Sequence, residues 1–316
     1  MDDKLIFGIY PGGLDALQKG LPNNPEKINE ALDILQGDKQ LFLVRGYRGF
    51  DNVDVEAPEM MEQYCINGRK LDLTLCYRSA TGDIDGWIIF IKRMIHQYST
   101  HLHKIQITEE PNNPDALTGG DGSSKNIHEA IIEGVIVAKR EASLLGLHIM
   151  VGFNAVVSFN PTDSFWQSLA ERITPKFMNS LDFVGLDFFP DVFIPLPAKP
   201  DGITISIEEA VNLVLNQFRK ANLAIGKISD NIPIHITENG WATTPERTFQ
   251  RQKEVLIDTL LVVNQLKVEL NITHYEYFGL RDADSSDNGF QFGLMKDDYI
   301  SKPAFDAYKT LIKSYG

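Results

Sequence analysis

The sequence contains very little cysteine. Only Cys65 and Cys76 occur in 316 residues, and neither belongs to a C-x-x-C pair of the kind that holds a metal ion. Isolated cysteines of this sort are usually small buried side chains, so we expect two free thiols. The cysteine content therefore gives no support for a thiolate metal centre.

Positive charge is also scarce. There are 30 Lys and Arg against 43 Asp and Glu, and the net charge is −13. Such a chain repels phosphate backbones, and no run interleaves basic and aromatic residues, so we expect no nucleic-acid partner.

Long apolar runs are missing too. The longest apolar runs, such as Ile88–Ile91 and Leu260–Val263, are too short to span a bilayer, so we expect no membrane insertion.

The first residues show no leader. Met1-Asp2-Asp3-Lys4 leads directly into an apolar stretch, without the hydrophobic region of a signal peptide. We therefore expect a cytoplasmic protein, although a secreted protein from which a leader had been removed begins in the same way. The oligomeric state is left open by the sequence.

What the sequence does contain is a regular alternation of short apolar runs and longer amphipathic segments. Runs that are apolar at nearly every position are typical of parallel strands buried on both faces. Eight strands are predicted, at Leu5–Tyr10, Leu41–Arg45, Leu71–Cys76, Lys104–Thr108, His148–Phe153, Phe183–Asp187, Ile232–Thr237 and Thr273–Phe278. Each is followed by a predicted helix, at Pro25–Leu35, Ala57–Ile66, Ile84–Tyr98, Ile127–Leu145, Ser164–Ile173, Ile207–Leu223, Pro245–Val268 and Pro303–Tyr315.

Eight β/α units in series predict an α/β protein with one (β/α)8 TIM barrel that spans residues 1–316. The alternative is an open doubly wound sheet. That fold usually carries G-x-G-x-x-G after its first strand, and the segment Tyr10-Pro11-Gly12-Gly13 does not provide it. The barrel is therefore favoured.

Polar and aromatic residues end the predicted strands, which is where TIM barrels hold their active sites. They are Tyr10, Arg45, Tyr77, Arg78, Glu109, Glu110, Asn154, Asp187, Glu238, Asn239, Arg281 and Asp282. The set contains no cysteine–histidine metal site, so we expect neither metal nor organic cofactor. His101 and His103 have amidohydrolase-like spacing but precede the fourth strand, at the wrong end of the barrel. We expect them, with His148 and His274, to be surface histidines.

Two glutamates have the arrangement needed to hydrolyse a glycosidic bond. Glu110 follows strand four and Glu238 ends strand seven, and the ends of these strands face each other across the mouth of the barrel. Two carboxylates placed there can lie roughly 5–5.5 Å apart, which suits a retaining double displacement. One carboxylate attacks the anomeric carbon while the other, protonated, donates its proton to the leaving oxygen.

The chain resembles the glycoside hydrolases of clan A, (β/α)8 enzymes with the acid/base on strand four and the nucleophile on strand seven. The resemblance is carried by these motifs: Ile236-Thr237-Glu238-Asn239-Gly240, Glu110-Pro111, Tyr277-Phe278-Gly279-Leu280-Arg281-Asp282, Phe292-Gly293-Leu294 and Lys302-Pro303-Ala304. It implies a retaining O-glycosyl hydrolase that acts on a β-linked glycoside or oligosaccharide, with Glu110 as acid/base and Glu238 as nucleophile. It also implies that Arg45 contacts the nucleophile and keeps it ionised.

Four positions depart from the pattern of that clan. Glu109 stands where an asparagine is expected before the acid/base, and Phe188 stands where a strand-six tyrosine usually donates to the nucleophile. Phe278 replaces the strand-eight tryptophan, and Tyr77 replaces the strand-three histidine of the β-glucosidase-like members. These departures argue against a standard β-glucosidase more than against hydrolysis itself. The sugar, the linkage and the choice between exo and endo action stay open.

Several side chains are expected to contact the substrate. Trp241 follows the nucleophile and is placed to stack on a pyranose ring, whereas Trp87 and Trp166 fall on helices and are predicted to be packing residues. Substrate-binding candidates are Tyr10, Arg45, Glu109, Asn154, Asp187, Trp241 and Phe278. For Glu109 a solvated rim charge, and for Arg45 a structural ion pair, are the alternatives. A carbohydrate-binding pseudoenzyme or a transglycosidase on the same barrel are the alternative functions.

Overall fold

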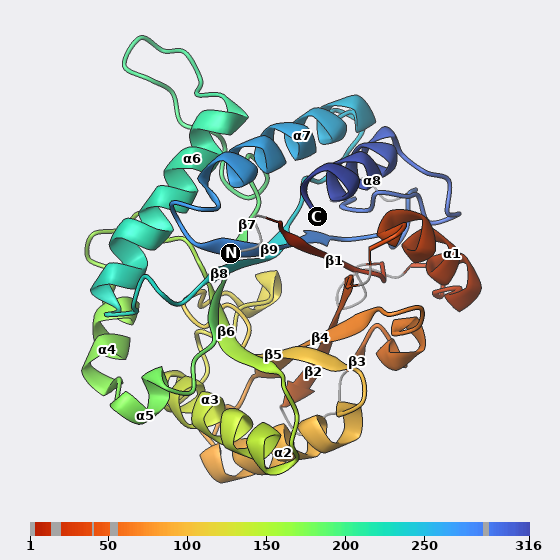
Figure 1. The fold of residues 1–316 in the computed structure, drawn as a ribbon. Coiled ribbons are helices and arrows are strands. Elements are labelled where there is room, and N and C mark those ends of the chain that lie inside the picture. Colours follow the sequence, from red (N-terminus) through yellow and green to blue (C-terminus); the bar gives the residue numbers. More distant parts are fainter. Residues whose placement is uncertain (1–3, 14–19, 40, 51–55, 287–290) are drawn as a thin grey trace.

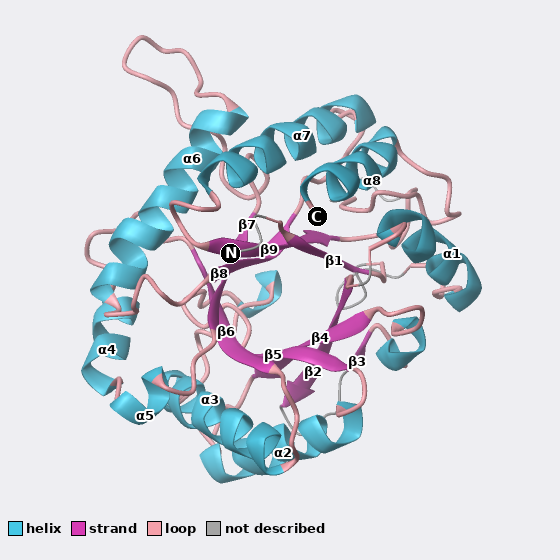
Figure 2. Ribbon diagram, in the orientation of Figure 1, coloured by secondary structure: helices cyan, strands magenta, loops and turns pink. Residues whose placement is uncertain are grey.

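In the computed structural model, which describes residues 4–13, 20–39, 41–50, 56–286 and 291–316, eight parallel strands form a closed barrel surrounded by helices (Figures 1 and 2). The strands follow one another in the order β1-β9-β8-β7-β6-β5-β4-β2, and pairing of β1 with β2 closes the ring. The two-residue strand β3 (Glu56–Ala57) pairs antiparallel with β2. The prediction of a TIM barrel is confirmed.

The barrel strands are β1 (Ile6–Tyr10), β2 (Leu43–Phe50), β4 (Lys70–Tyr77), β5 (Leu102–Ile107), β6 (Met150–Val156), β7 (Phe183–Phe188), β8 (Ile234–Asn239) and β9 (Ile272–Phe278). Because β3 is outside the barrel, the fourth barrel strand is β5 and the seventh is β8. The helices are α1 (Pro25–Gln36), α2 (Ile84–Tyr98), α3 (Ile127–Leu144), α4 (Ser164–Arg172), α5 (Pro175–Met178), α6 (Ile207–Gln217), α7 (Phe249–Leu266) and α8 (Pro303–Tyr315). None of these described helices has the length and hydropathy to cross a membrane.

Capping side chains decide where several helices begin. α6 starts after Ser206, which forms a capping box with Glu209. α7 starts at Phe249, later than the predicted Pro245, because the Thr248 side chain accepts the hydrogen bond that opens the helix. A π-helical turn then continues α6 over Phe218–Leu223, so the helical segment ends at Leu223, as predicted.

Two elements differ from the sequence prediction. β2 continues to Phe50 instead of ending at Arg45, because β4 pairs with it in register as far as Tyr77 even though the apolar pattern stops. The helix predicted over Ala57–Ile66 is wrong. This described segment contains the end of β3 and a single 3-10 turn, and Met60 has a left-handed φ of 49°, which an α-helix does not accommodate.

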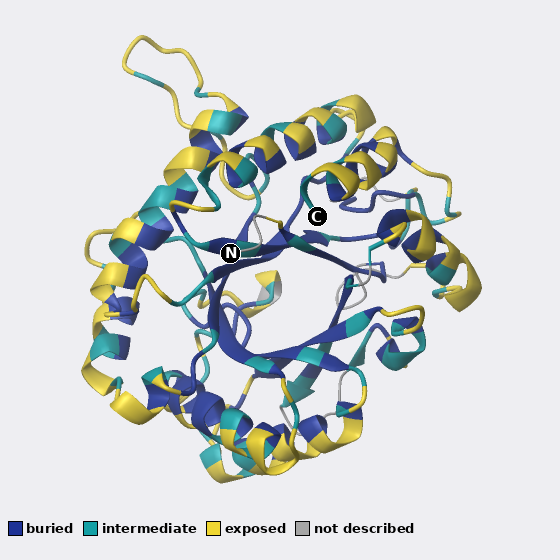
Figure 3. Ribbon diagram, viewed as in Figure 1, coloured by how far each residue is buried: buried dark blue, intermediate teal, exposed yellow. Residues whose placement is uncertain are grey.

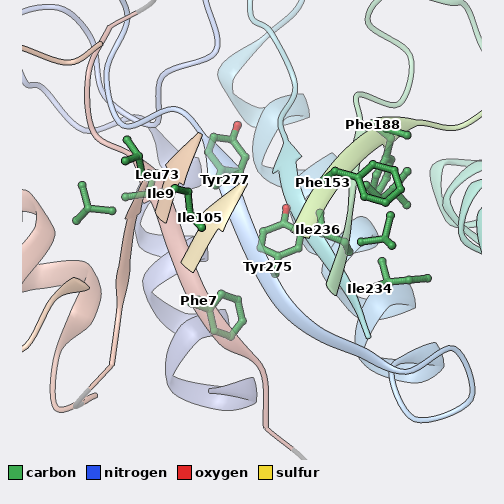
Figure 4. Packing of buried hydrophobic residues seen from close by; sticks show 14 of the residues in the cluster. Phe7, Ile9, Leu73, Ile105, Phe153, Phe188, Ile234, Ile236, Tyr275 and Tyr277 are labelled. Carbon is green, nitrogen blue, oxygen red and sulfur yellow. The ribbon is translucent and has the colours of Figure 1, made fainter. Parts of the chain in front are cut away.

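The layer between barrel and helices is apolar. Leu73, Ile105 and Ile236 are fully buried, and Figure 4 shows them in one packed cluster with Phe153 and Tyr275. Each helix buries one stripe against this layer and exposes the other, as the colouring of Figure 3 shows. Burial of this apolar surface is the main favourable contribution to folding.

The inside of the barrel is charged, whereas Val, Ile and Leu usually fill it. Arg45, Asp72, Lys104 and Glu276 are each at most 1% exposed. Asp72 pairs with Arg45 at 2.7 Å and with Lys104 at 3.2 Å, and Lys104 also contacts Glu276. Gly8 leaves room for this network, because a Cβ there would lie 2.8 Å from Cγ of Glu276.

Histidines occupy the N-terminal end of the barrel. His274 is 2% exposed, and its ring centre lies 3.7 Å from that of the fully buried His235. The prediction that His274 is a surface residue is therefore wrong: strand alternation turns its side chain into the barrel. His103 is half-buried, with its ring 6.2 Å from His274, and His148 is exposed as predicted.

Candidate active site

Four buried carboxylates lie at the C-terminal end of the barrel. Glu109 and Glu110 follow β5, Asp187 lies near the end of β7, and Glu238 lies near the end of β8. Each residue is at most 7% exposed. One oxygen of each of Glu109, Asp187 and Glu238 lies within 4.8 Å of the other two. Carboxylates from the ends of three separate strands thus converge on one point, and the member from strand four is Glu109 rather than the predicted Glu110.

A bulge in β8 lies beside Glu238. Leu186 pairs with Ile236 and Asp187 pairs with Glu238, so Thr237 is an extra residue relative to β7. Its hydroxyl donates to Asp187 at 2.5 Å. Bulges turn side chains in new directions and are common next to active sites. The bulge places Glu238 and Asp187 opposite each other.

The chain after β5 is held in an irregular conformation. Thr108 and Glu110 have positive φ values of 68° and 40°. The backbone N–H of Glu109 donates to Asp121 at 2.8 Å, and that of Glu110 donates to Asn154 at 2.8 Å. These buried acceptors fix the directions in which the two glutamates leave the chain.

Glu238 receives two donors from β2. The hydroxyl of Tyr47 donates to Oε1 of Glu238, and Nε of Arg45 lies 3.3 Å from the same oxygen. The predicted contact between Arg45 and the strand-seven glutamate is therefore present.

Glu109 and Glu110 have different partners. Oε2 of Glu109 accepts from Gln106 at 2.7 Å and from Arg45 at 3.3 Å, and its other oxygen lies 3.4 Å from Nδ2 of Asn154. Among the residues that the structure describes, Glu110 accepts one side-chain hydrogen bond, from Asn113 at 2.7 Å. Glu109 is thus anchored in the barrel interior rather than being a solvated rim charge, whereas Glu110 is held less tightly.

The crowding of acids favours their protonated forms. Burial, followed by the charges of Asp187 and Glu238, raises the pKa of Glu110 well above its usual value. Burial and Glu238 also raise the pKa of Glu109, against the opposing charge of Arg45. Burial and Glu238 raise the pKa of Asp187 to about 7. The cluster therefore shifts its carboxyl groups toward the protonated form, as an acid catalyst requires.

Among the described residues, Glu109, Asp187 and Glu238 form a group whose spacing could hold a metal ion. Arg45 already bridges two of them, since its guanidinium reaches Glu109 and Glu238 at 3.3 Å each. The group also accepts from neutral donors: Asp187 takes hydrogen bonds from Thr237 and Asn154. Arg45 thus supplies positive charge to this carboxylate cluster.

Aromatic rings line the site next to Glu238. Tyr10 stacks on Phe278 with ring centres 5.0 Å apart, and its edge meets Tyr47 at 5.5 Å. Phe189 and Phe292 continue from Phe278 in T-shaped contacts, with ring centres at 6.1 Å and 5.9 Å. The row therefore leads from the carboxylates toward the loops after β7 and β9.

The predicted stacking residue Trp241 has a covered ring. It is 3% exposed, and the guanidinium of Arg247 lies 3.8 Å from the ring centre. Trp87 and Trp166 are buried in the layer outside the barrel, so their predicted packing role is confirmed. An aromatic face for a sugar would thus have to come from the row that contains Tyr10 and Phe278 rather than from Trp241.

Sequence reasoning missed Tyr47, Gln106 and Asp121. Tyr47 is two residues beyond Arg45, and side chains two apart on a strand share a face, so a longer β2 would have indicated it. Gln106 has the same relation to Lys104 on β5. No sequence pattern indicated Asp121, because it reaches the site from a loop.

Comparisons with known proteins identify the fold. No family model and no curated protein matches the sequence. A β-glucosidase from Exiguobacterium marinum has a TM-score of 0.61 at 16% identity, over 100% of this chain and 99% of that one. A β-glucosidase from Thermotoga maritima in complex with castanospermine has a TM-score of 0.62 at 12% identity, again over 100% and 99%.

A β-glucuronidase from Ruminococcus gnavus in complex with D-glucuronic acid has a TM-score of 0.62 at 15% identity, over 97% of this chain and 48% of that one. At such identities the likeness concerns the path of the backbone. The chain therefore has a barrel fold that is shared with known glycoside hydrolases.

Proposed function

We propose that the protein is a glycoside hydrolase that cleaves β-linked O-glycosidic bonds with retention, with Glu238 as nucleophile and Glu110 as acid/base. The observation that carries the proposal is the convergence of buried carboxyl groups from the ends of β5, β7 and β8. Oxygens of Glu109, Asp187 and Glu238 lie within 4.8 Å of one another, and the charges of Asp187 and Glu238 act on Glu110 beside them. Retention requires Glu110 and Glu238 to flank the glycosidic bond about 5–5.5 Å apart, whereas inverting enzymes need room for a water molecule between the carboxylates.

Double displacement has two balanced steps. In the first, a carboxylate oxygen of Glu238 bonds to the anomeric carbon as the bond from that carbon to the leaving oxygen breaks, and Glu110 gives its proton to that oxygen. In the second, Glu110 takes a proton from water, the water oxygen bonds to the anomeric carbon, and the bond to Glu238 breaks. No redox change occurs in either step.

Glu110 suits the proton-transfer role better than Glu109. Glu109 is anchored by Arg45 and Gln106, which restrains its side chain. Glu110 accepts only from Asn113 in the described hydrogen bonds, and burial together with Asp187 raises its pKa. A carboxyl group that is protonated yet loosely held can deliver a proton and recover it later.

The fold neighbours support a carbohydrate substrate. Two of them are β-glucosidases and one is a β-glucuronidase, and the latter was solved with D-glucuronic acid. A glycoside or oligosaccharide is accordingly the proposed substrate. The hydroxyl of Tyr47 on Glu238 argues against the alternative of a pseudoenzyme, because it provides the donor whose usual source is replaced by Phe188.

The test is turnover of a panel of chromogenic β-gluco-, galacto-, manno- and xylosides by the wild type and by Glu238→Gln. We expect at least one substrate to turn over, and the variant to be inactive while its circular dichroism is unchanged. The first product detected by NMR should be the β-anomer. Equal turnover by the variant would exclude Glu238 as nucleophile. Oligosaccharide binding without turnover of any substrate would favour a pseudoenzyme.

A further inference from the structure

The second donor to Glu238 comes from a strand that the clan pattern does not assign to this role. We propose that Tyr47 is the positioning residue that orients Glu238 through a donated hydrogen bond, in place of a tyrosine on strand six. The proposal rests on the proposed function of Glu238 as nucleophile. It concerns how the nucleophile is held and leaves the chemical steps unchanged.

The hydroxyl of Tyr47 has a partner on each side. It accepts a hydrogen bond from Nε of Arg45 at 2.7 Å and donates its own proton to Oε1 of Glu238. A hydroxyl that accepts from a cation is a stronger donor, because hydrogen bonds in a chain polarise one another. Burial and the charge of Glu238 raise the pKa of Tyr47 well above its usual value, so the proton to be donated is retained.

The position of Tyr47 is fixed by its surroundings. It lies in the middle of β2, paired with Thr74 of β4, and its ring makes a T-shaped contact with Tyr10 at 5.5 Å. Arg45 is held in turn by Asp72 at 2.7 Å. Groups on a regular strand are held more precisely than groups on a loop, as positioning of a reacting atom requires.

Phe188 cannot take this role. It is 5% exposed and belongs to the apolar layer outside the barrel, where Figure 4 shows it beside Phe153. Its backbone oxygen accepts from Asn239 at 2.7 Å. The phenol therefore approaches Glu238 across the barrel interior from β2, whereas Phe188 on the adjacent strand β7 stays in the packing layer.

The charges around Glu238 make the donor from Tyr47 important. The titratable and charged groups that face Glu238 are Arg45 and Tyr47 on β2, Glu109 and Glu110 after β5, and Asp187 on β7. Three of the five are carboxyl groups, whose negative charges repel the carboxylate of Glu238. Loss of the phenol leaves Arg45 as the only donor to Glu238 in this set.

The experiment is Tyr47→Phe, with Tyr308→Phe as the matched control. Tyr308 is fully buried whereas Tyr47 is half-buried, and the hydroxyl of Tyr308 donates to the backbone oxygen of Gly8 at 2.6 Å, so each variant loses one hydrogen bond donated by a phenol. We expect kcat/KM of Tyr47→Phe to fall about ten- to a hundred-fold, because hydrogen bonds to charged groups are strong. We expect the acidic limb of its pH profile to move up by about one unit. Tyr308→Phe should keep the wild-type pH profile.

A second variant keeps the hydroxyl and the shape of the ring. Tyr47→3-fluorotyrosine makes the phenol more acidic, and therefore a stronger donor, so the acidic limb should move to lower pH. The proposal is overturned if the acidic limb of both Tyr47 variants stays at the wild-type pH while Glu238→Gln is inactive. If Glu238→Gln is itself active, the proposed function fails, and the positioning role of Tyr47 fails with it.

Discussion

The two faces of the barrel strands are built from different kinds of residue. On β5, Ile105 points into the apolar layer, while its neighbours Lys104 and Gln106 take part in polar contacts inside the barrel. The outer layer is formed by interchangeable aliphatic and aromatic side chains. The interior is a network in which each charge has a particular partner, such as Lys104 with Glu276.

The difference between these regions separates stability from function. Apolar burial contributes roughly 25 cal/mol per Å² and needs little directional precision. A buried charge costs several kcal/mol to desolvate and is tolerated only with partners in good geometry. The ion-pair network that ends at Arg45 therefore adds little net stability. Its role is to orient the groups that donate hydrogen bonds to Glu238.

The largest predicted effect distinguishes the role of Glu110 from that of its neighbour Glu109. Glu110→Gln should lower kcat/KM for substrates with poor leaving groups by about 10²- to 10⁴-fold, which is the usual contribution of an acid/base. Added azide should restore turnover of an activated aryl glycoside, because it attacks the glycosyl-enzyme without needing a base. We expect no azide rescue for Glu109→Gln. Rescue of Glu109→Gln and not of Glu110→Gln would exchange the two assignments.

The next effect compares the inside and outside of one strand. Lys104→Met removes the partner of two buried carboxylates, Asp72 and Glu276, and should lower the free energy of unfolding by about 3–5 kcal/mol. Its neighbour Ile105→Val, in the apolar layer, should cost only about 0.5–1.5 kcal/mol. Urea denaturation measures both values. Equal free energies of unfolding for the two variants would contradict the proposed difference between the inside and the outside of the strand.

The double variant Lys104→Met/Glu276→Leu sharpens this comparison. Removal of the carboxylate relieves the unpaired charge, so the double variant should be more stable than Lys104→Met alone. Its catalytic rate should nevertheless stay below that of the wild type, because Asp72 and Arg45 lose their support. A double variant less stable than Lys104→Met would contradict this account.

The smallest effect concerns the N-terminal and C-terminal ends of the barrel interior. Their contributions to the free energy of unfolding change in opposite directions with pH. Burial and neighbouring cationic groups lower the pKa of His235 and His274, so the unfolded chain binds more protons and stability falls below about pH 6.5. Burial raises the pKa of Glu109 and of Asp187, so the folded chain binds more protons and their contribution is lost as pH rises. Each group contributes at most about 1.4 kcal/mol per pH unit.

Two variants separate these contributions in urea denaturation between pH 5 and pH 8. His235→Phe should reduce the loss of stability between pH 7 and pH 5, and Glu109→Gln should reduce the loss between pH 5 and pH 8. His148→Gln is the control, because His148 is exposed and should leave both slopes unchanged. Wild-type slopes in His235→Phe and Glu109→Gln would show that the buried groups do not titrate as proposed.

Much of the fold could be predicted because the outer layer follows simple periodicity. Apolar runs and amphipathic helices mark this layer, and α2 and α8 have the predicted bounds. The convergence of strands four and seven also follows from their order in a closed barrel. These features depend on pattern and topology, which can be read without knowing individual contacts.

The interior was harder to predict because its partners are far apart in sequence. β2 was predicted too short since Gly46 and Arg48 interrupt the apolar run, and Tyr47 was lost with the missing part. The position of His274 on its strand was read correctly, but its direction depends on which face of the strand closes around the interior. Such contacts become visible only when the strands are brought together.

The most direct test of the account is covalent trapping by a 2-deoxy-2-fluoro glycoside of a sugar that the enzyme turns over, followed by mass spectrometry of its peptides. The electron-poor sugar slows both steps, so a retaining enzyme accumulates the glycosyl intermediate. We predict one adduct, on Glu238, which is absent from Glu238→Gln and released with time in excess substrate. An adduct on Glu109, Glu110 or Asp187, or turnover with inverted product and no adduct, would contradict the central claim.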